Sequence, residues 1–129
     1  MKVNIGKYPN HRFYHNWLYN WFGYSPKQRT RIKIHNYDTW SMDYTLAHII
    51  LPMLVQLKAT KHGYPADLTE QEWDDILDEM IWAFEQKCRD DWMEDYDYNK
   101  WDREGAKAHQ ERMSNGFRLF GRYYENLWD

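Results

Sequence analysis

The sequence predicts a mainly helical α+β fold, with about four helices around a central buried helix and a small two-stranded sheet near the N-terminus. Two observations support this prediction. Apolar residues recur at helical spacing in four stretches, whereas polar and apolar residues alternate in two short segments, as in half-buried strands. A length of 129 residues corresponds to one domain with one hydrophobic core, so we expect a single domain over residues 1–129.

The two alternating segments, Lys2–Ile5 and Arg31–His35, predict the strands. Successive side chains of a strand point to opposite faces, so Ile32 and Ile34 are expected to face the core. We expect the sheet to wrap around the first helix. Because an isolated pair of strands is only marginally stable in water, this pair must pack on helices or extend across a partner chain.

The first two helices are predicted by their apolar residues and by the residues that bound them. The first carries an aromatic stripe and ends at Gly23. The second starts at Asp38 or Ser41 and runs to about His62. It is apolar nearly all round, which is typical of a central, buried helix, and Pro52 predicts a kink within it.

The third and fourth helices have clear local signals. The stretch Thr69–Glu72 has the pattern of a capping box, and an apolar stripe at helical spacing follows it as far as Cys88. The last helical stretch, residues 101–127, contains Gly116 and Gly121. Each weakens a helix by roughly 1 kcal/mol relative to alanine unless it permits close packing.

Composition limits the cellular setting and the range of partners. A single cysteine excludes an intramolecular disulfide and the cysteine-rich zinc frameworks, and a reducing compartment such as the cytosol fits it best. No stretch resembles a membrane span or a signal peptide, so no membrane partner is expected. Aromatic residues make up 19% of the chain, which suits a core and also an interface. From the aromatic excess and the small sheet we expect a homo-oligomer, with a dimer favoured.

Charge is divided unevenly along the chain. Residues 1–62 hold nine Lys and Arg against two Asp, a net charge of +7, whereas residues 63–129 have a net charge of −10. Such asymmetry can mark a site for anions on the basic half. Alternatively, the two halves attract each other within the fold.

No motif predicts catalysis, a cofactor or a resident metal. His11 and His15 have the spacing of two metal ligands but lack a third, and Asp95–Asn99 opens like a calcium loop whose required Gly and Glu are missing. No phosphate-binding Gly loop or serine nucleophile elbow occurs. Cys88 follows an apolar stripe, as a core thiol does. We therefore expect a protein that is not an enzyme.

The best candidate for a binding site is the basic face of the second strand, because arginine forks match phosphate geometry and flat rings stack on bases. A solvated edge strand that carries charges against aggregation would look the same. Asp43, expected at the edge of the core, either accepts hydrogen bonds at its helix N-terminus or binds a hydroxyl or amino group of a ligand. The other candidate residues are Arg29, Arg31, Lys33, His35, Tyr37 and Trp40.

Three strings in the chain are specific rather than generic: DTWSMD running into IILPML in residues 38–54, LDEMIWAFE in residues 77–85, and SNGFRLFG followed by YYENLWD in residues 114–129. Together they resemble a family of uncharacterised small proteins of tailed bacteriophages, over roughly residues 38–129. The resemblance implies a phage origin and a place in the host cytoplasm, and it brings no catalytic residues. Family members are longer around Tyr64–Thr69 and Tyr96–Lys100, which predicts loops there.

Three functions remain open on these observations. The first is a non-catalytic phage accessory protein that binds and neutralises a host component, such as a nucleotide signal of host antiphage defence. The second is a protein–protein adaptor or an inhibitor of a host enzyme. The third is a weak nucleic-acid binder on the basic half, against which the net charge of −3 argues, since nonspecific binding depends on an excess of Lys and Arg.

Overall fold

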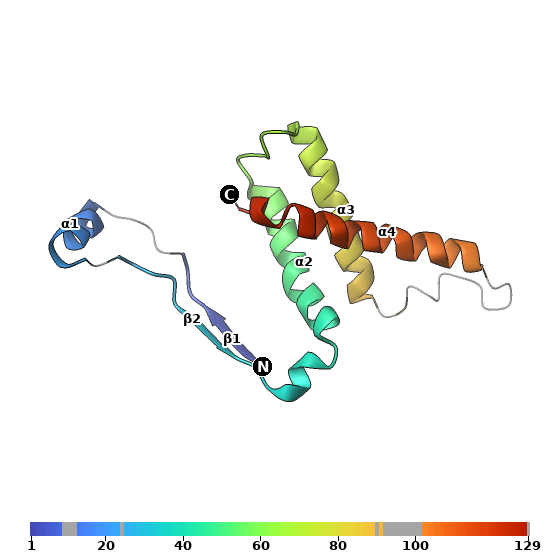
Figure 1. Cartoon of the computed structure of the whole chain (residues 1–129), viewed down its shortest axis with the longest axis horizontal. Helices are drawn as coiled ribbons and strands as arrows, with labels where there is room; N and C mark the ends of the chain where they lie inside the picture. Colours follow the sequence, from blue (N-terminus) through green and yellow to red (C-terminus); the bar gives the residue numbers. More distant parts are fainter. Residues whose placement is uncertain (9–12, 24, 90, 92–101, 129) are drawn as a thin grey trace. The chain divides into compact units, whose positions relative to one another are not determined.

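The computed structural model describes residues 1–8, 13–23, 25–89, 91 and 102–128, and in these residues it has four α-helices and a two-stranded antiparallel sheet (Figure 1). The predicted mainly helical α+β fold is thus confirmed. The chain divides into two compact units, Met1–Trp40 and Ser41–Asp129. The elements are β1 (Lys2–Ile5), α1 (Phe13–Phe22), β2 (Thr30–Lys33), the 3-10 helix η1 (Asn36–Thr39), α2 (Met42–Thr60), α3 (Glu70–Cys88), α4 (Arg103–Arg122) and the 3-10 helix η3 (Tyr124–Asn126).

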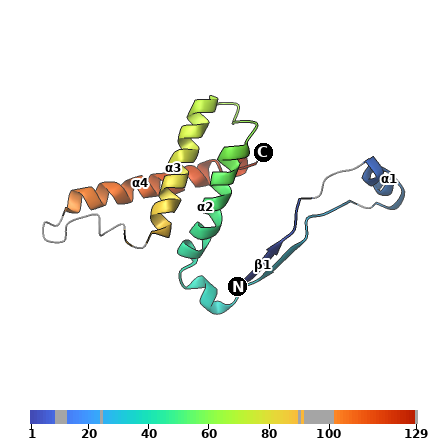
Figure 2. The same ribbon diagram turned by 180° about the vertical axis from the view of Figure 1, so that it is seen from behind.

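In the first unit, β1 and β2 form an antiparallel ribbon, with α1 in the connection between them (Figures 1 and 2). Gly23 ends α1 with a φ of 65°, as predicted, and its N–H donates to the carbonyl oxygen of Tyr19 at 2.9 Å. All eight strand residues are exposed, so the sheet does not wrap around α1. The prediction that Ile32 and Ile34 face a core is therefore wrong: they are 56% and 51% exposed.

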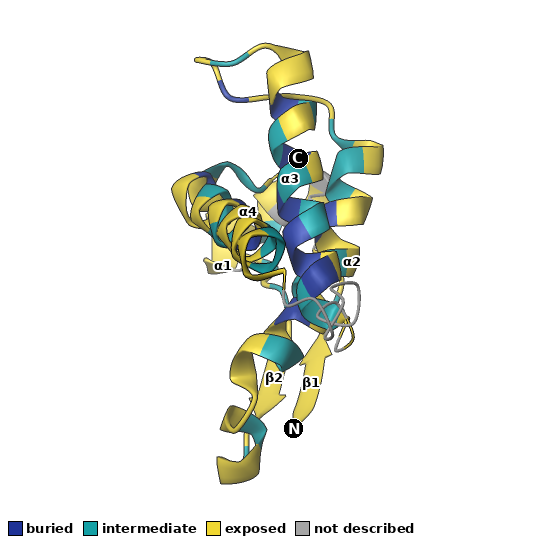
Figure 3. Ribbon diagram, turned by 90° about the vertical axis from the view of Figure 1, so that its right-hand side faces the viewer, coloured by how far each residue is buried: buried dark blue, intermediate teal, exposed yellow. Residues whose placement is uncertain are grey.

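In the second unit, α3 is the central helix, and it packs against α2 on one side and α4 on the other (Figures 1 and 3). Six of its residues are buried, whereas α2 buries only Ala47 and Leu54. The sequence placed the central buried helix between Asp38 or Ser41 and about His62, and this is wrong because, among the described helices, it is α3 that packs extensively on two others. The buried apolar core is Ala47, Leu54, Trp73, Leu77, Met80, Ala83, Phe84, Met113 and Tyr123.

The predicted capping box at the start of α3 is confirmed. Thr69 Oγ1 accepts a hydrogen bond from the N–H of Glu72 at 3.2 Å, and Glu72 Oε2 accepts one from the N–H of Thr69 at 2.7 Å. Leu68 and Trp73 on either side both pack in the core. Two backbone amides at the helix N-terminus, those of Thr69 and Glu72, are thereby satisfied, which helps to set the first residue of α3.

Ion pairs and one close backbone approach hold α3 to its neighbours. Toward α2, Lys58 Nζ lies 2.5 Å from Asp78 Oδ1 and Lys61 Nζ lies 2.9 Å from Asp74 Oδ1. These pairs join lysines of the basic half of the chain, residues 1–62, to aspartates of the acidic half, residues 63–129. Some of the opposite charges therefore attract each other within the fold. Toward α4, Gly116 is buried against α3 and leaves no room for a methyl group, since a Cβ there would lie 2.8 Å from the carbonyl oxygen of Glu79.

Two further expectations, about membrane spans and about loops, can be compared with the described residues. No helix among them is long and apolar enough to span a membrane. Residues 61–69 form the predicted loop between α2 and α3. The expectations that concern His11, Asp95–Asn99 and Tyr96–Lys100 fall outside the described residues, as does the side chain of His15.

Candidate functional site

The register of the ribbon gathers cations on one of its faces. Lys2 pairs with Lys33 and Asn4 with Arg31 across the two strands. The ladder continues by one residue, because the N–H of Gly6 donates to the carbonyl oxygen of Arg29 at 2.8 Å. Side chains directly opposite each other, and those two residues apart along a strand, share a face of the sheet. We refer to Lys2, Arg29, Arg31 and Lys33 as the basic face.

The other face of the same ribbon is apolar. Val3 lies opposite Ile32, and Ile5 lies opposite Thr30. The ribbon is therefore amphipathic, with the cations separated from the aliphatic side chains by strand alternation alone. At the far end of the basic face, a side chain on Gly6 would contact Arg29 Cβ at 3.6 Å, so glycine leaves open space beside that arginine.

Among the described residues, no acidic side chain neutralises the charges of the basic face. Across the part of the chain that the structure describes, none of its four cations forms an ion pair. Like charges directly opposite each other in a sheet are destabilising, and Lys2 and Lys33 are such a pair. A face of this kind has a positive potential that attracts anions.

The aromatic residues next to the basic face are arranged by η1. The N–H of His35 donates to Asp38 Oδ2 at 2.7 Å, and the amino group of Met1 lies 2.9 Å from the same oxygen. These two interactions lower the pKa of the Asp38 carboxyl, the backbone hydrogen bond from His35 being the larger cause. Because Asp38 pairs with the amino group of Met1, η1 lies next to the end of β1 that carries Lys2.

His35 and Tyr37 form a stacked pair, with ring centroids 5.3 Å apart and planes inclined by 6°. Tyr37 is exposed, and Trp40 is 92% exposed, so the ring faces of Trp40 are open to solvent. The prediction that His35 belongs to the strand is wrong, since β2 ends at Lys33 and His35 precedes η1. Its ring therefore stacks on Tyr37 instead of continuing the row of cations.

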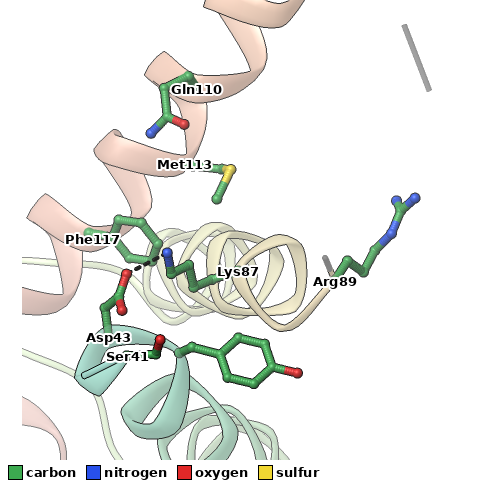
Figure 4. Close-up of a pocket in the computed structure, with 8 residues that line it drawn as sticks. Ser41, Asp43, Lys87, Arg89, Gln110, Met113 and Phe117 are labelled. Atoms are coloured by element: carbon green, nitrogen blue, oxygen red, sulfur yellow. Dashed lines mark ion pairs between the residues drawn. The ribbon is translucent and has the colours of Figure 1, made fainter. Parts of the chain in front are cut away.

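Asp43 belongs to the second unit and has a different partner. Its Oδ2 lies 2.5 Å from Lys87 Nζ, and this pair crosses an open cleft of about 590 Å³ between the start of α2, the end of α3 and the middle of α4 (Figure 4). The hydrogen bond from Lys87 is the largest cause of the lowered pKa of Asp43. The carboxylate is 68% exposed, so its expected place at the edge of the core is wrong. Figure 4 shows Arg89 pointing away from the pair.

The structure thus brings together three of the predicted cations, Arg29, Arg31 and Lys33, and adds Lys2, which the sequence analysis missed. The alternation of Lys2–Ile5 had predicted the first strand, but it did not give the register that places Lys2 opposite Lys33. In the described ranges, no three His, Cys, Asp or Glu residues are placed to hold a metal ion. Cys88 is half-buried, and burial raises the pKa of its thiol, which disfavours the thiolate.

Comparisons with protein-family models, with curated proteins and with solved structures find no match for this chain.

Proposed function

We propose that this chain is a non-catalytic accessory protein of a tailed bacteriophage that binds a phosphorylated small molecule, such as a nucleotide signal of host defence, on its basic face. The observation that supports this most is the pairing of Lys2 with Lys33 beside two arginines, with no acidic partner among the described residues. An anion bound there would relieve the repulsion between the two lysines. Sequestration of the ligand would then need no chemical step.

The chemistry of the site suits an anion with several charged oxygens, such as a phosphoryl group. Arg29 and Arg31 can each offer two parallel N–H donors, which match a phosphate bidentately, and the lysines add point charges. The nearby rings of Tyr37 and Trp40 offer flat surfaces on which a base can stack, an interaction that does not depend on base identity. A ligand that carries both a phosphate and a base is a nucleotide.

The test is calorimetric titration of the full chain with mononucleotides and cyclic dinucleotides. For the ligand that binds, Arg31→Ala should weaken affinity by about ten- to hundred-fold, since a hydrogen bond to a charged group contributes about 1.5–3 kcal/mol. Arg31→Lys should restore only part of this loss because it lacks the fork. Lys107→Ala on α4, a highly exposed cation of the second unit, is the matched control and should bind like the parent.

Equal binding by the parent, Arg29→Ala, Arg31→Ala and Lys33→Ala would contradict the proposal and make the basic face a solvated edge. Binding of oligonucleotides that is tighter than that of mononucleotides and falls steeply with salt would instead favour a nucleic-acid ligand.

A second candidate function, inhibition of a host enzyme by direct contact, is favoured by the exposed aromatic cluster of α1. The rings of Trp21 and Phe22 each lie 6.2 Å from that of Trp17, and all three side chains are exposed. Aromatic residues are enriched at interface centres. Trp21→Ala should abolish binding to a host enzyme identified by co-purification, whereas Tyr19→Ala, also exposed but absent from the Trp17 cluster, should retain it.

A further inference from the structure

A cavity of the second unit lies between the loop that joins α2 to α3 and the segment that follows α4. Figures 1 and 2 both show the end of α4 beside the start of this loop. The cavity has a volume of about 500 Å³, which falls within the roughly 300–1,000 Å³ of small-molecule sites in proteins. We call it the aromatic pocket, and its lining includes Gly63, Tyr64, Pro65, Trp73, Asn126 and Trp128.

The aromatic pocket is preformed, because both of its walls are fixed to the core. Trp73, only 2% exposed, forms the floor and packs edge-on against the buried Tyr123, with ring centroids 5.5 Å apart. On the loop side, Pro65 is buried and its carbonyl oxygen accepts a hydrogen bond from the N–H of Leu68 at 3.0 Å. On the other side, the N–H of Asn126 donates to the carbonyl oxygen of Tyr123 at 2.9 Å. A ligand would therefore enter without the cost of ordering a loop.

The exposed part of the pocket lining is flat and uncharged. Tyr64 and Trp128 are 53% and 75% exposed, so ring surface is open for stacking. Flat rings favour a flat ligand, since aromatic rings stack on one another and on any base. None of the described lining residues is Lys, Arg, Asp or Glu. An ion would lose part of its hydration there without gaining a charged partner, so the pocket favours an uncharged molecule.

One amide side chain adds polar recognition to these rings. Asn126 is half-buried, and among the described residues its side chain has no hydrogen-bond partner. An asparagine amide presents a donor and an acceptor side by side, and this pair matches a heteroaromatic ring with an amino group next to a ring nitrogen. Space for a ring exists beside Gly63, because nothing lies within 4 Å of the position that a Cβ would take there.

We infer that the aromatic pocket binds an uncharged, planar heteroaromatic molecule, which stacks on Trp128 and hydrogen-bonds to the amide of Asn126. Trp128 is the larger and the more exposed of the two open rings. The pocket shares no residue with the basic face, with Tyr37 or with Trp40, so the inference does not rest on the proposed function. The two sites also differ in chemistry, since the basic face attracts anions and the pocket offers no lysine or arginine among its described lining residues.

Titration of the isotope-labelled full chain with adenine, followed by NMR, tests this inference. The side-chain amide signals of Asn126 and the indole N–H signal of Trp128 should shift. Trp128→Ala should weaken binding by about ten- to hundred-fold, as expected for the loss of one stacked base. Trp128→Phe keeps a ring and should retain most of the affinity. Asn126→Leu, which is similar in size but lacks a donor and an acceptor, should weaken binding by about two- to tenfold.

Two control variants separate this pocket from the proposed site of the first unit. Trp40→Ala is the matched control, because Trp40 is 92% exposed and belongs to the first unit, and it should bind adenine like the parent. Arg31→Ala should also bind adenine like the parent, whatever its effect on nucleotides. Failure of the proposed function would therefore leave the adenine result unchanged.

Three results would overturn the inference. In the first, adenine shifts neither the Asn126 nor the Trp128 signals of the parent, or Trp128→Ala binds it as tightly. In the second, Trp40→Ala loses adenine binding, which would place the stacked ring in the first unit. In the third, cyclohexanol, a saturated ring with one hydroxyl group, binds as tightly as adenine, which would make the pocket a general apolar cavity.

Discussion

At Gly116, the missing side chain sets how closely α4 approaches α3. A methyl group there would overlap Ala83 Cβ and the carbonyl oxygen of Glu79, whereas nothing lies within 4 Å of the position that a Cβ would take at Gly121. The sequence showed two glycines in one helix, and only the packing separates their roles. Gly116 permits a close crossing of α4 and α3, and Gly121 is an ordinary helical residue.

Gly116→Ala is expected to destabilise the fold by about 1–3 kcal/mol through overpacking, because both neighbouring groups belong to α3 and one is backbone. Gly121→Ala should stabilise it by up to about 1 kcal/mol through helix propensity, since the added methyl meets open space. Urea denaturation followed by circular dichroism measures both. Equal effects of the two substitutions would show that Gly116 is not at a tight crossing.

Leu77 and Ile81 belong to the same predicted apolar stripe, but they are buried to different extents in the structure. Leu77 is fully buried and Ile81 only half-buried. Leu77→Ala should therefore cost about 2–5 kcal/mol, and Ile81→Ala should cost clearly less. Chemical denaturation of the two variants checks this order, and a larger loss at Ile81 would contradict it.

At the scale of elements, the start of α3 was the most predictable feature and can be tested alone. Thr69→Ala removes the side-chain oxygen that accepts from the N–H of Glu72 and should lower stability by about 1 kcal/mol. Thr60→Ala is a suitable control, because Thr60 is exposed at the end of α2 and its hydroxyl donates only to the backbone oxygen of Gln56. Its effect should stay within about 0.5 kcal/mol.

The Asp43–Lys87 pair joins the first turn of α2 to the last turn of α3 and predicts a pH dependence. The pKa of Asp43 is lowered in the folded state, mainly by Lys87, so its stabilising contribution is present above the usual aspartate pKa. The contribution is lost as the pH falls below that value, through the lowered pKa of the folded state. The stability difference between the parent and Asp43→Asn should therefore shrink as the pH falls from neutral to below the usual aspartate pKa of 3.8.

Asp67→Asn, in the loop before α3 and outside any ion pair of the described residues, is the control for that experiment. Thermal unfolding followed at several pH values measures the difference for both variants. A difference for Asp43→Asn that stays constant down to the acid end would mean that the pair does not form in solution.

For the whole molecule, sequence predicted what depends on neighbouring residues and missed what depends on distant ones. The capping box at Thr69 and the glycine end of α1 are local, and both are confirmed. Whether α2 is central depends on how many helices pack on it, which its apolar content does not encode. Lys2 joins the basic face, and Lys87 meets Asp43, only through contacts between residues far apart in the chain.

In the candidate site, too, sequence predicted what depends on neighbouring residues and missed what depends on distant ones. Alternation along one strand was enough to predict that Arg29, Arg31 and Lys33 share a side. The position of His35 was missed because η1 begins where the strand was expected to continue, and a hydrogen bond to Asp38 rather than a sheet partner holds its backbone. The residues of the proposed site were therefore largely identifiable, whereas their geometry was not.

The exposed ribbon of the first unit and the buried α3 of the second imply very different lifetimes for their amide protons. A ladder of four residue pairs whose residues are all exposed opens to solvent readily, whereas amides of a central helix exchange only through much larger unfolding events. In deuterated buffer, β1 and β2 should take up label well before α3. A bound phosphorylated ligand should slow uptake in the ribbon alone, so mass-resolved exchange could locate the site without any substitution.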